Sequence, residues 1–289
     1  MIRTRGAVAL AAVALAASAG AYAAAGSKSR APRFEHVIVV VFENHGAAQV
    51  LQDPAATTFR SLAARYASLE NYDAVAHPSL PNYLALVSGS TYGFHSDCTR
   101  CVVSGPNLAD TLAARGLTWK TYVEDIPRRL EHVTDPGVKA RIPFLYFRDV
   151  LDSPRRMSDI VPLADFRRDL QADRLPSFSL VIPDLCHDMH DCSVGTGDRW
   201  LASFMRPLLR SGDLKRSVVF LTFDEAARQD DRGGGGQVAA IVVGPLVRPH
   251  SVSVRPLNHY SLLRTIEGAW RLRLLGLSAS AQPITGIWR

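Results

Sequence analysis

The sequence predicts an α/β protein, a three-layer α/β/α sandwich around a central, mostly parallel sheet. Four apolar runs rich in Val, Ile and Phe, at 36–42, 178–182, 217–223 and 238–243, show no polar alternation. Such runs are typical of strands that are buried on both faces of a parallel sheet. Segments with helical periodicity separate the runs, as the crossover connections of a parallel sheet require.

The first half of the chain supplies a strand and two helices. The run 36–42 is the expected first strand, and residues 58–69 place Phe59 and Leu62 at helical spacing, which predicts the first crossover helix. A second short helix is expected just after Ser79, with Pro81 in its first turn. The ordinary structural role for a serine at that point is a helix N-cap.

The second half repeats this alternation. A helix over 107–117 leads into a strand near 118–123, whereas the arginine-rich segment 127–165 is broken by prolines and predicts no clear element. An amphipathic helix is expected over 198–209, and Asn258 opens the last long helix. Four glycines precede the run 238–243 without the Lys-Ser/Thr of a phosphate-binding loop, so we expect a flexible turn there, at Gly233 to Gly236.

The chain divides into a leader and one domain. Residues 1–25 combine a basic start, an Ala-rich apolar stretch and small residues, which predicts a cleaved signal peptide and a secreted or periplasmic protein. The apolar stretch is too short and Ala-rich for a membrane anchor, so no stable membrane insertion is expected. Residues 26–34 form a flexible lead-in, and 35–289 are long enough for a single catalytic domain.

The charge balance favours small anionic ligands over nucleic acid. The formal net charge is +6, of which two units come from Arg3 and Arg5 in the predicted leader. The other arginines are scattered without interleaved aromatic residues, which is typical of a solvated surface rather than of a nucleic-acid-binding stripe. Nothing in the pattern specifies an oligomeric state.

Four cysteines indicate disulfides in a secreted chain. Cys98 and Cys101 are three residues apart, and Cys186 and Cys192 are six apart. Three pairings are possible, of which the two local ones are the simplest. The alternative is a zinc site that combines these thiols with a nearby histidine, which an oxidising compartment disfavours.

Acidic residues follow three of the apolar runs, where ligands bind in parallel sheets. Glu43, Asp184 and Asp224 come after the runs 36–42, 178–182 and 217–223. Carboxylates that meet at the carboxyl edge of a sheet repel one another unless a cation lies between them, and divalent cations prefer such oxygen ligands. The sequence therefore predicts a metal-assisted hydrolase.

The neighbouring polar residues suit phosphoester hydrolysis. Ser79 at a helix start is the expected nucleophile, while a metal held by Glu43, Asp224, Glu225 and His259 would lower the pKa of its hydroxyl. The neutral donors Asn44 and Asn82 can contact the remaining phosphate oxygens, and either His190 or His259 can protonate the leaving alkoxide. Each residue taken alone also fits a helix cap or an ion pair.

Several motifs in order resemble one known family. They are Val-Phe-Glu-Asn-His, His-Pro-Ser-Leu-Pro-Asn-Tyr-Leu-Ala, Asn-Leu-Ala-Asp, Gly-Leu-Thr-Trp-Lys-Thr-Tyr, Asp-Met-His-Asp-Cys, Thr-Phe-Asp-Glu-Ala and Asn-His-Tyr-Ser-Leu-Leu-Arg. Over residues 35–272 the chain resembles the bacterial phosphoesterase family, which contains secreted acid phosphatases and phospholipases C of the alkaline-phosphatase-like superfamily. The resemblance implies that fold.

The resemblance also implies roles for individual residues. It makes Ser79 the nucleophile with Asn82 beside it, and Glu43 the first acidic metal ligand with Asn44 next to it. The later acidic pair corresponds to Asp224 and Glu225, and the last histidine to His259. Asp188 and His190 are the preferred functional pair of their segment, because relatives often carry Asn at 184 and 187. The chain has fewer histidine ligands than the two-zinc enzymes, which favours one divalent metal of unspecified identity.

The expected activity is hydrolysis of small phosphorylated substrates by an acid-phosphatase-type phosphomonoesterase that forms a phosphoserine intermediate. A phospholipase C or another phosphodiesterase would use the same site, because the choice depends on space near the second ester oxygen. A catalytically inactive binding protein on the same fold is the third possibility. A sulfatase is disfavoured, because none of Cys98, Cys101 and Ser79 lies in the Cys/Ser-x-Pro-x-Arg context that formylglycine formation requires in that group.

Overall fold

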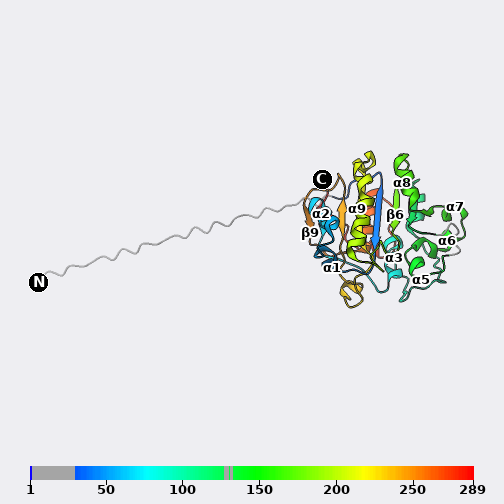
Figure 1. Cartoon of the computed structure of the whole chain (residues 1–289), viewed down its shortest axis with the longest axis horizontal. Coiled ribbons are helices and arrows are strands. Elements are labelled where there is room, and N and C mark those ends of the chain that lie inside the picture. Colours follow the sequence, from blue (N-terminus) through cyan, green and yellow to red (C-terminus); the bar gives the residue numbers. More distant parts are fainter. Residues whose placement is uncertain (2–29, 127–129, 131–132) are drawn as a thin grey trace.

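A large β-sheet forms the centre of the molecule (Figure 1). The structure is a computed structural model that describes Met1 and residues 30–126, 130 and 133–289. The strands are β1 (Val37–Phe42), β2 (Ala67–Leu69), β3 (Tyr72–Asp73), β4 (Trp119–Val123), β5 (Ile160–Pro162), β6 (Phe178–Ile182), β7 (Val218–Phe223), β8 (Ile241–Val243), β9 (Ser251–Ser253) and β10 (Leu257–Asn258). The main sheet has the order β5-β4-β6-β1-β7-β8-β2-β9, and β10 and β3 form a second, small sheet.

The main sheet is mostly parallel, as predicted. Strand β8 runs antiparallel to both of its neighbours, and every other pair in the sheet is parallel. All residues of β1, β6 and β7 are buried. This burial on both faces explains why their sequences are continuously apolar.

Helices cover the sheet and give the α/β/α sandwich that was predicted. The α-helices are α1 (Ala47–Leu51), α2 (Thr57–Arg65), α3 (Ser79–Ser88), α4 (Leu108–Ala113), α5 (Pro136–Ala140), α6 (Arg148–Leu151), α7 (Pro154–Met157), α8 (Ala164–Gln171), α9 (Val194–Arg210) and α10 (His259–Trp270). The 3₁₀ helices are η2 (Pro143–Tyr146), η3 (Gly212–Arg216), η4 (Arg232–Gly234) and η5 (Gly276–Ala279). Helix α2 packs against α9, and α3 packs against α10.

Two local predictions need correction. The helix expected over 58–69 ends at Arg65, because Ala67 already begins β2, which pairs with β8 and β9. The N-cap of α3 is Pro78, so Ser79 is the first residue inside the helix. Its hydroxyl does not cap the helix and is therefore available to other partners.

The segment 127–165, which predicted no clear element, contains several short ones. Within its described part lie α5, η2, α6, α7 and β5, which adds a parallel strand beside β4. The predicted leader lies outside the described residues apart from Met1. In the part of the chain that the structure describes, no helix combines the length and the hydropathy needed to cross a bilayer.

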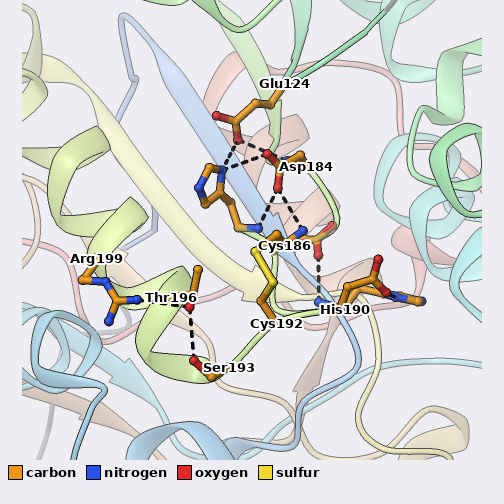
Figure 2. Close-up of a disulfide and its surroundings, with 11 residues drawn as sticks. Glu124, Asp184, Cys186, His190, Cys192, Ser193, Thr196 and Arg199 are labelled. Carbon is orange, nitrogen blue, oxygen red and sulfur yellow. Dashed lines mark hydrogen bonds and ion pairs between the residues drawn. A yellow bond between two sulfur atoms is a disulfide. The ribbon is translucent and has the colours of Figure 1, made fainter.

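Both local disulfides are present, and the described residues contain no free cysteine. Cys98 is bonded to Cys101, and Cys186 is bonded to Cys192 (Figure 2). The thiols are therefore not zinc ligands. The second bridge closes the loop between β6 and α9, the loop that carries Asp188 and His190.

Candidate active site

Four neighbouring parallel strands deliver acidic side chains to one edge of the sheet. In sheet order β4, β6, β1 and β7 are followed by Glu124, Asp184, Glu43 and Asp224. Parallel pairing brings the carboxyl ends of these strands together. The acids separate into two groups, one beyond β1 and β7 and the other beyond β4 and β6.

The first group is built around Glu43 and Ser79. The Ser79 hydroxyl donates a hydrogen bond to Glu43 Oε2 at 3.0 Å, and the Tyr83 hydroxyl donates to Glu43 Oε1 at 2.7 Å. Ser79 and Tyr83 are one turn apart on α3, so they face the same carboxylate. All three side chains are buried.

Asp224 completes this group from the neighbouring strand. Its Oδ1 accepts a hydrogen bond from the Asn44 amide at 3.1 Å, while its buried Oδ2 has no hydrogen-bond partner among the described residues. Burial, and then repulsion between the two carboxylates, raises the pKa of Glu43 well above its usual value. Burial is also the main cause of the raised pKa of Asp224, with repulsion from Glu225 next.

These carboxylates fit a divalent cation. They supply hard oxygen donors at a buried position, and Asp224 Oδ2 is a buried acceptor with nothing to bind. Glu43 and Asp224 could therefore contribute oxygen ligands to a metal site. Of the four predicted ligands Glu43, Asp224, Glu225 and His259, however, no three have ligand atoms that all lie within 4.8 Å of one another.

Both ring nitrogens of His259 are occupied by hydrogen bonds. Its Nε2 donates to the Asp224 carbonyl oxygen at 2.6 Å, and its Nδ1, 3.1 Å away, accepts from the Tyr72 hydroxyl. The ring is fully buried, and burial lowers its pKa to about 4. In this arrangement a neutral His259 holds the end of β7 in place.

Glu225 contacts His77, a histidine two residues before Ser79. Its Oε2 lies 2.8 Å from His77 Nδ1, and His77 Nε2 donates to the Asp230 carbonyl at 3.0 Å. Burial, with repulsion from Glu43 next, raises the pKa of Glu225 to about 8. Below that pH the Glu225 carboxyl is largely protonated, so it places no full negative charge in this buried contact.

The two asparagines differ in their surroundings. Asn44 lines the pocket in front of Ser79. Asn82 is fully buried: its Oδ1 accepts from the amides of Val75 and Ala76, and its Nδ2 donates to the carbonyls of Ala76 and Pro78. Asn82 thus fixes the turn that leads to Ser79 and has no donor left for a phosphate oxygen.

Asp188 and His190 lie in the loop that the Cys186–Cys192 disulfide closes. Asp188 forms an ion pair with Arg141 Nη1, and its other oxygen accepts from the His190 amide at 2.9 Å. Burial raises the pKa of Asp188 to about 6, although Arg141 opposes that shift. The His190 ring lies 2.6 Å from Asp191 Oδ1 and also lines the pocket.

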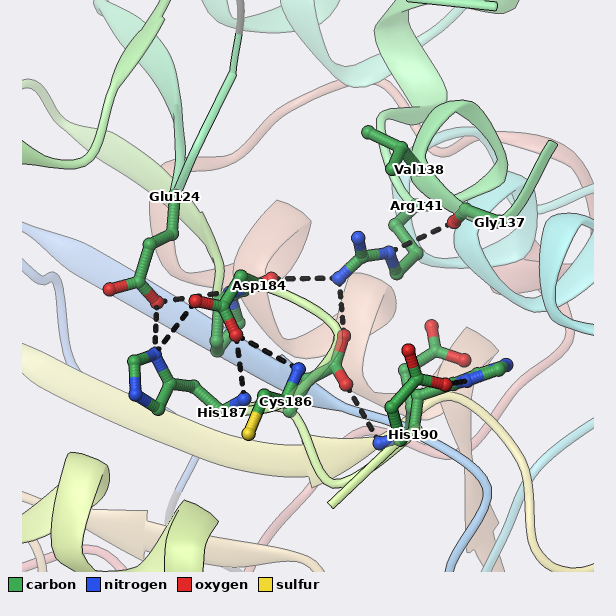
Figure 3. A network of polar contacts seen from close by, with 12 residues as sticks. Glu124, Gly137, Val138, Arg141, Asp184, Cys186, His187 and His190 are labelled. Atoms are coloured by element: carbon green, nitrogen blue, oxygen red, sulfur yellow. Dashed lines mark hydrogen bonds and ion pairs between the residues drawn. The ribbon is translucent and has the colours of Figure 1, made fainter. Parts of the chain in front are cut away.

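The second acidic group could hold a metal ion of its own. His187 Nδ1 is 3.0 Å from both Glu124 Oε2 and Asp184 Oδ2 (Figure 3). Among the described residues, these three form the only group of three or more His, Cys, Asp or Glu side chains whose ligand atoms all lie within 4.8 Å of one another. The group is partly exposed, and Asp184 Oδ1 already accepts from two backbone amides.

The pocket in front of Ser79 has a volume of about 490 Å³. It is lined by Asn44, Pro78, Ser79, His95, Ser96, Asp97, His190, Glu225, Ala227 and Arg228. At the start of α3 the Leu80 amide already donates to Asp97 Oδ1 at 2.9 Å. The helix start therefore offers an incoming phosphate fewer free amides than the sequence suggested.

Comparisons with known proteins show which family the chain belongs to. The phosphoesterase family model matches residues 47–273. The chain belongs to the phosphoesterase family. It is 35% identical, over 90% of its length and 85% of the relative, to a phosphatidylinositol-3-phosphatase of Mycobacterium tuberculosis (strain ATCC 25618 / H37Rv). This phosphoesterase is thus a hydrolase of phosphoric esters.

Other relatives and solved structures are more distant. The phosphoesterase is 30% identical, over 72% of its length, to a phosphate-repressible acid phosphatase of Penicillium chrysogenum, of which it spans 53%. An alkaline phosphatase superfamily protein from Vibrio parahaemolyticus superposes with a TM-score of 0.60 at 12% identity, over 84% of this chain and 67% of that one. At that identity the likeness shows the fold alone, and it confirms the alkaline-phosphatase-like prediction.

Several side chains of the site were not predicted. Tyr83 had a usable signal, because it lies one helical turn after Ser79. Glu124 follows the predicted strand 118–123, as the other acids follow theirs. His77 opens the motif His-Pro-Ser-Leu-Pro-Asn-Tyr-Leu-Ala, although no role was predicted for it. Arg141 and Asp97 come from segments without a clear pattern, so only the tertiary structure brings them to the site.

Proposed function

We propose that this phosphoesterase is an acid-phosphatase-type phosphomonoesterase in which Ser79 is the nucleophile. The observation that carries the proposal is the hydrogen bond from the Ser79 hydroxyl to Glu43 Oε2, at the base of the pocket that Ser79 lines. A serine hydroxyl with a carboxylate acceptor and access to a pocket is the arrangement that an activated nucleophile requires.

The first step joins Ser79 Oγ to phosphorus as the bond to the leaving oxygen breaks. The serine proton goes to Glu43 Oε2, the acceptor that already contacts it. Glu43 accepts this proton only in its ionised form, which a bound cation would favour over the protonated form that burial favours. Water then cleaves the phosphoserine and regenerates the hydroxyl.

Protonation of the leaving group is best assigned to His190. Its ring lines the pocket and is more than a third exposed, and Asp191 orients it through Nδ1. His259 is a poor choice because both of its nitrogens are engaged in hydrogen bonds. Asp188 supports His190 through the backbone amide of that residue.

One divalent cation would be held by Glu43 and Asp224, with Asn44 and Glu225 at the edge of the same site. When bound, its positive charge lowers the pKa of the serine hydroxyl and polarises a phosphoryl oxygen. The unpartnered Asp224 Oδ2 supports this placement. His259 serves the same site by holding the Asp224 backbone.

A monoester substrate is favoured over a diester. The mycobacterial relative and the Penicillium relative are both named as phosphatases, and neither name describes a phosphodiesterase. A secreted location is supported by the two disulfides, which persist in oxidising compartments.

The test compares the wild type with Ser79→Ala on three chromogenic substrates: p-nitrophenyl phosphate, bis-p-nitrophenyl phosphate and p-nitrophenylphosphorylcholine. We expect turnover of the monoester to dominate and to fall by about 10³-fold or more in the variant, as removal of a nucleophile requires. Chelator should abolish turnover, and divalent cations should restore it. An active Ser79→Ala protein would exclude the mechanism, and preference for a diester would exclude the substrate class.

A further inference from the structure

A second pocket lies at the far end of α10 from the active site. It has a volume of about 840 Å³, and five arginines line it: Arg30, Arg33, Arg115, Arg264 and Arg271. His259 begins α10 beside Asp224, whereas Arg271 is the C-cap of that helix. At about 1.5 Å of rise per residue, the two ends are roughly 18 Å apart.

Hydrogen bonds fix the segments that carry these arginines. Arg115 follows α4, and its Nη2 donates to the Arg271 carbonyl at 2.6 Å. The Trp270 indole donates from Nε1 to the Phe34 carbonyl at 2.9 Å, which holds the lead-in that bears Arg33 against α10. The arginines are therefore gathered by the fold, although they come from three distant parts of the sequence.

The positive charge of this pocket has little compensation. Within the described ranges, no carboxylate lies within 4.0 Å of these five guanidinium groups, whereas five other arginines form ion pairs. Glu267 attracts Arg264, but its carboxylate is buried and accepts from the Leu275 amide and the Ser278 hydroxyl. The C-terminal end of α10 adds only a partial negative charge of about one half.

We propose that this arginine pocket is an anion-binding site, distinct from the active site, for a ligand that carries two or more phosphate groups. Guanidinium groups bind phosphate oxygens in bidentate pairs, and several of them around one concavity match several phosphates. The volume lies within the range of small-ligand sites. The same chemistry occurs in a soluble polyphosphate and in the headgroup of a phosphorylated lipid.

Binding is measured on the full chain with Ser79→Ala, so that a probe is not consumed. One arm titrates inorganic triphosphate by calorimetry, and the other measures flotation with phosphatidylcholine vesicles with and without a phosphatidylinositol phosphate. The test variant adds Arg33→Gln, Arg115→Gln and Arg271→Gln. The control variant adds Arg167→Gln, Arg174→Gln and Arg206→Gln, which removes the same charge from exposed arginines outside the pocket.

We expect the test variant to weaken binding by about tenfold or more, since charge-assisted contacts are lost, and the control to weaken it less than about twofold. With Ser79 intact, the test variant should keep wild-type turnover of p-nitrophenyl phosphate. Triphosphate binding alone identifies a soluble ligand, and binding to the phosphorylated vesicles identifies a lipid headgroup. Binding in neither arm, or equal weakening in both variants, would overturn the proposal. The proposal does not depend on the function of Ser79.

Discussion

Arg141 and Asp188 form an ion pair from which solvent is almost entirely excluded. The side chains are 3% and 0% exposed; Arg141 is the C-cap of α5, and Asp188 lies in the loop between β6 and α9. Arg141 also donates to the Pro183 and Gly137 carbonyls, so one guanidinium joins the two segments (Figure 3). The pair fixes the loop that presents His190 to the pocket.

Removal of one partner of this pair should be costly. Arg141→Met leaves the Asp188 carboxylate buried and unpaired, which we expect to lower the free energy of unfolding by about 3–5 kcal/mol. Arg141→Met with Asp188→Asn removes both charges and should recover part of the loss. Urea denaturation of the wild type and of the single and double variants measures these free energies. If Arg141→Met were as stable as the wild type, the result would contradict a buried charge pair.

The Tyr83 hydroxyl should matter for activity more than for folding. Tyr83→Phe removes the hydrogen bond to Glu43 Oε1, which is worth about 1 kcal/mol in stability. We expect kcat/KM for p-nitrophenyl phosphate to fall by about tenfold, because that carboxylate takes the serine proton in the proposed mechanism.

Tyr146 offers the matched control for Tyr83. Its hydroxyl is buried without a hydrogen-bond partner in the described structure. Tyr146→Phe should therefore be neutral or slightly stabilising, with unchanged turnover. Equal kinetic effects of the two substitutions would show that the Tyr83 contact has no special role.

Glu267 should make the protein less stable as the pH rises. Burial raises the pKa of this carboxyl from 4.5 to about 7, despite hydrogen bonds from Ser278 and Leu275 that lower it. The folded state binds more protons than the unfolded state between these values. The contribution of Glu267 is therefore most favourable below pH 4.5 and is lost as the pH rises through 7, by roughly 3 kcal/mol at most.

Glu267→Gln isolates this effect, because the amide can accept from the Leu275 amide and donate to the Ser278 hydroxyl. Chemical denaturation at pH 5 and at pH 8 compares the two proteins. The wild type should lose more stability than the variant over this interval. A constant difference between the two proteins across pH would show that Glu267 has an ordinary pKa.

The Cys186–Cys192 bridge should stabilise the loop of Asp188 and His190. Replacing both cysteines by serine should lower the free energy of unfolding by about 2 kcal/mol, from the chain entropy that a loop of this size regains. Because His190 lines the pocket, turnover should fall as well. Thermal unfolding measures the change in stability, and turnover measures the effect on the pocket. Both are compared among the variant, the oxidised wild type and the reduced wild type.

The same residue patterns that predicted the fold also placed part of the site. Glu43 and Asp224 follow continuously apolar strands, so their meeting at one sheet edge follows from the parallel order of those strands. Asp184 also follows an apolar parallel strand, but its side chain lies beside Glu124 and His187 rather than beside Glu43, because β6 lies between β4 and β1. Sequence spacing does not reveal sheet order, so it could not separate the two groups.

The sequence by itself determined the long apolar strands, the Ser79 helix and the family, and it favoured the local disulfides, because each depends on neighbours in the chain or on short motifs. Only the tertiary structure decided which partner each polar side chain has. It enclosed Asn82 in a turn, occupied both nitrogens of His259, paired Arg141 with Asp188 and left Asp224 Oδ2 unpartnered. It also gathered five arginines at the far end of α10. Such contacts join residues far apart in the chain, and their energies depend on burial, which local patterns do not encode.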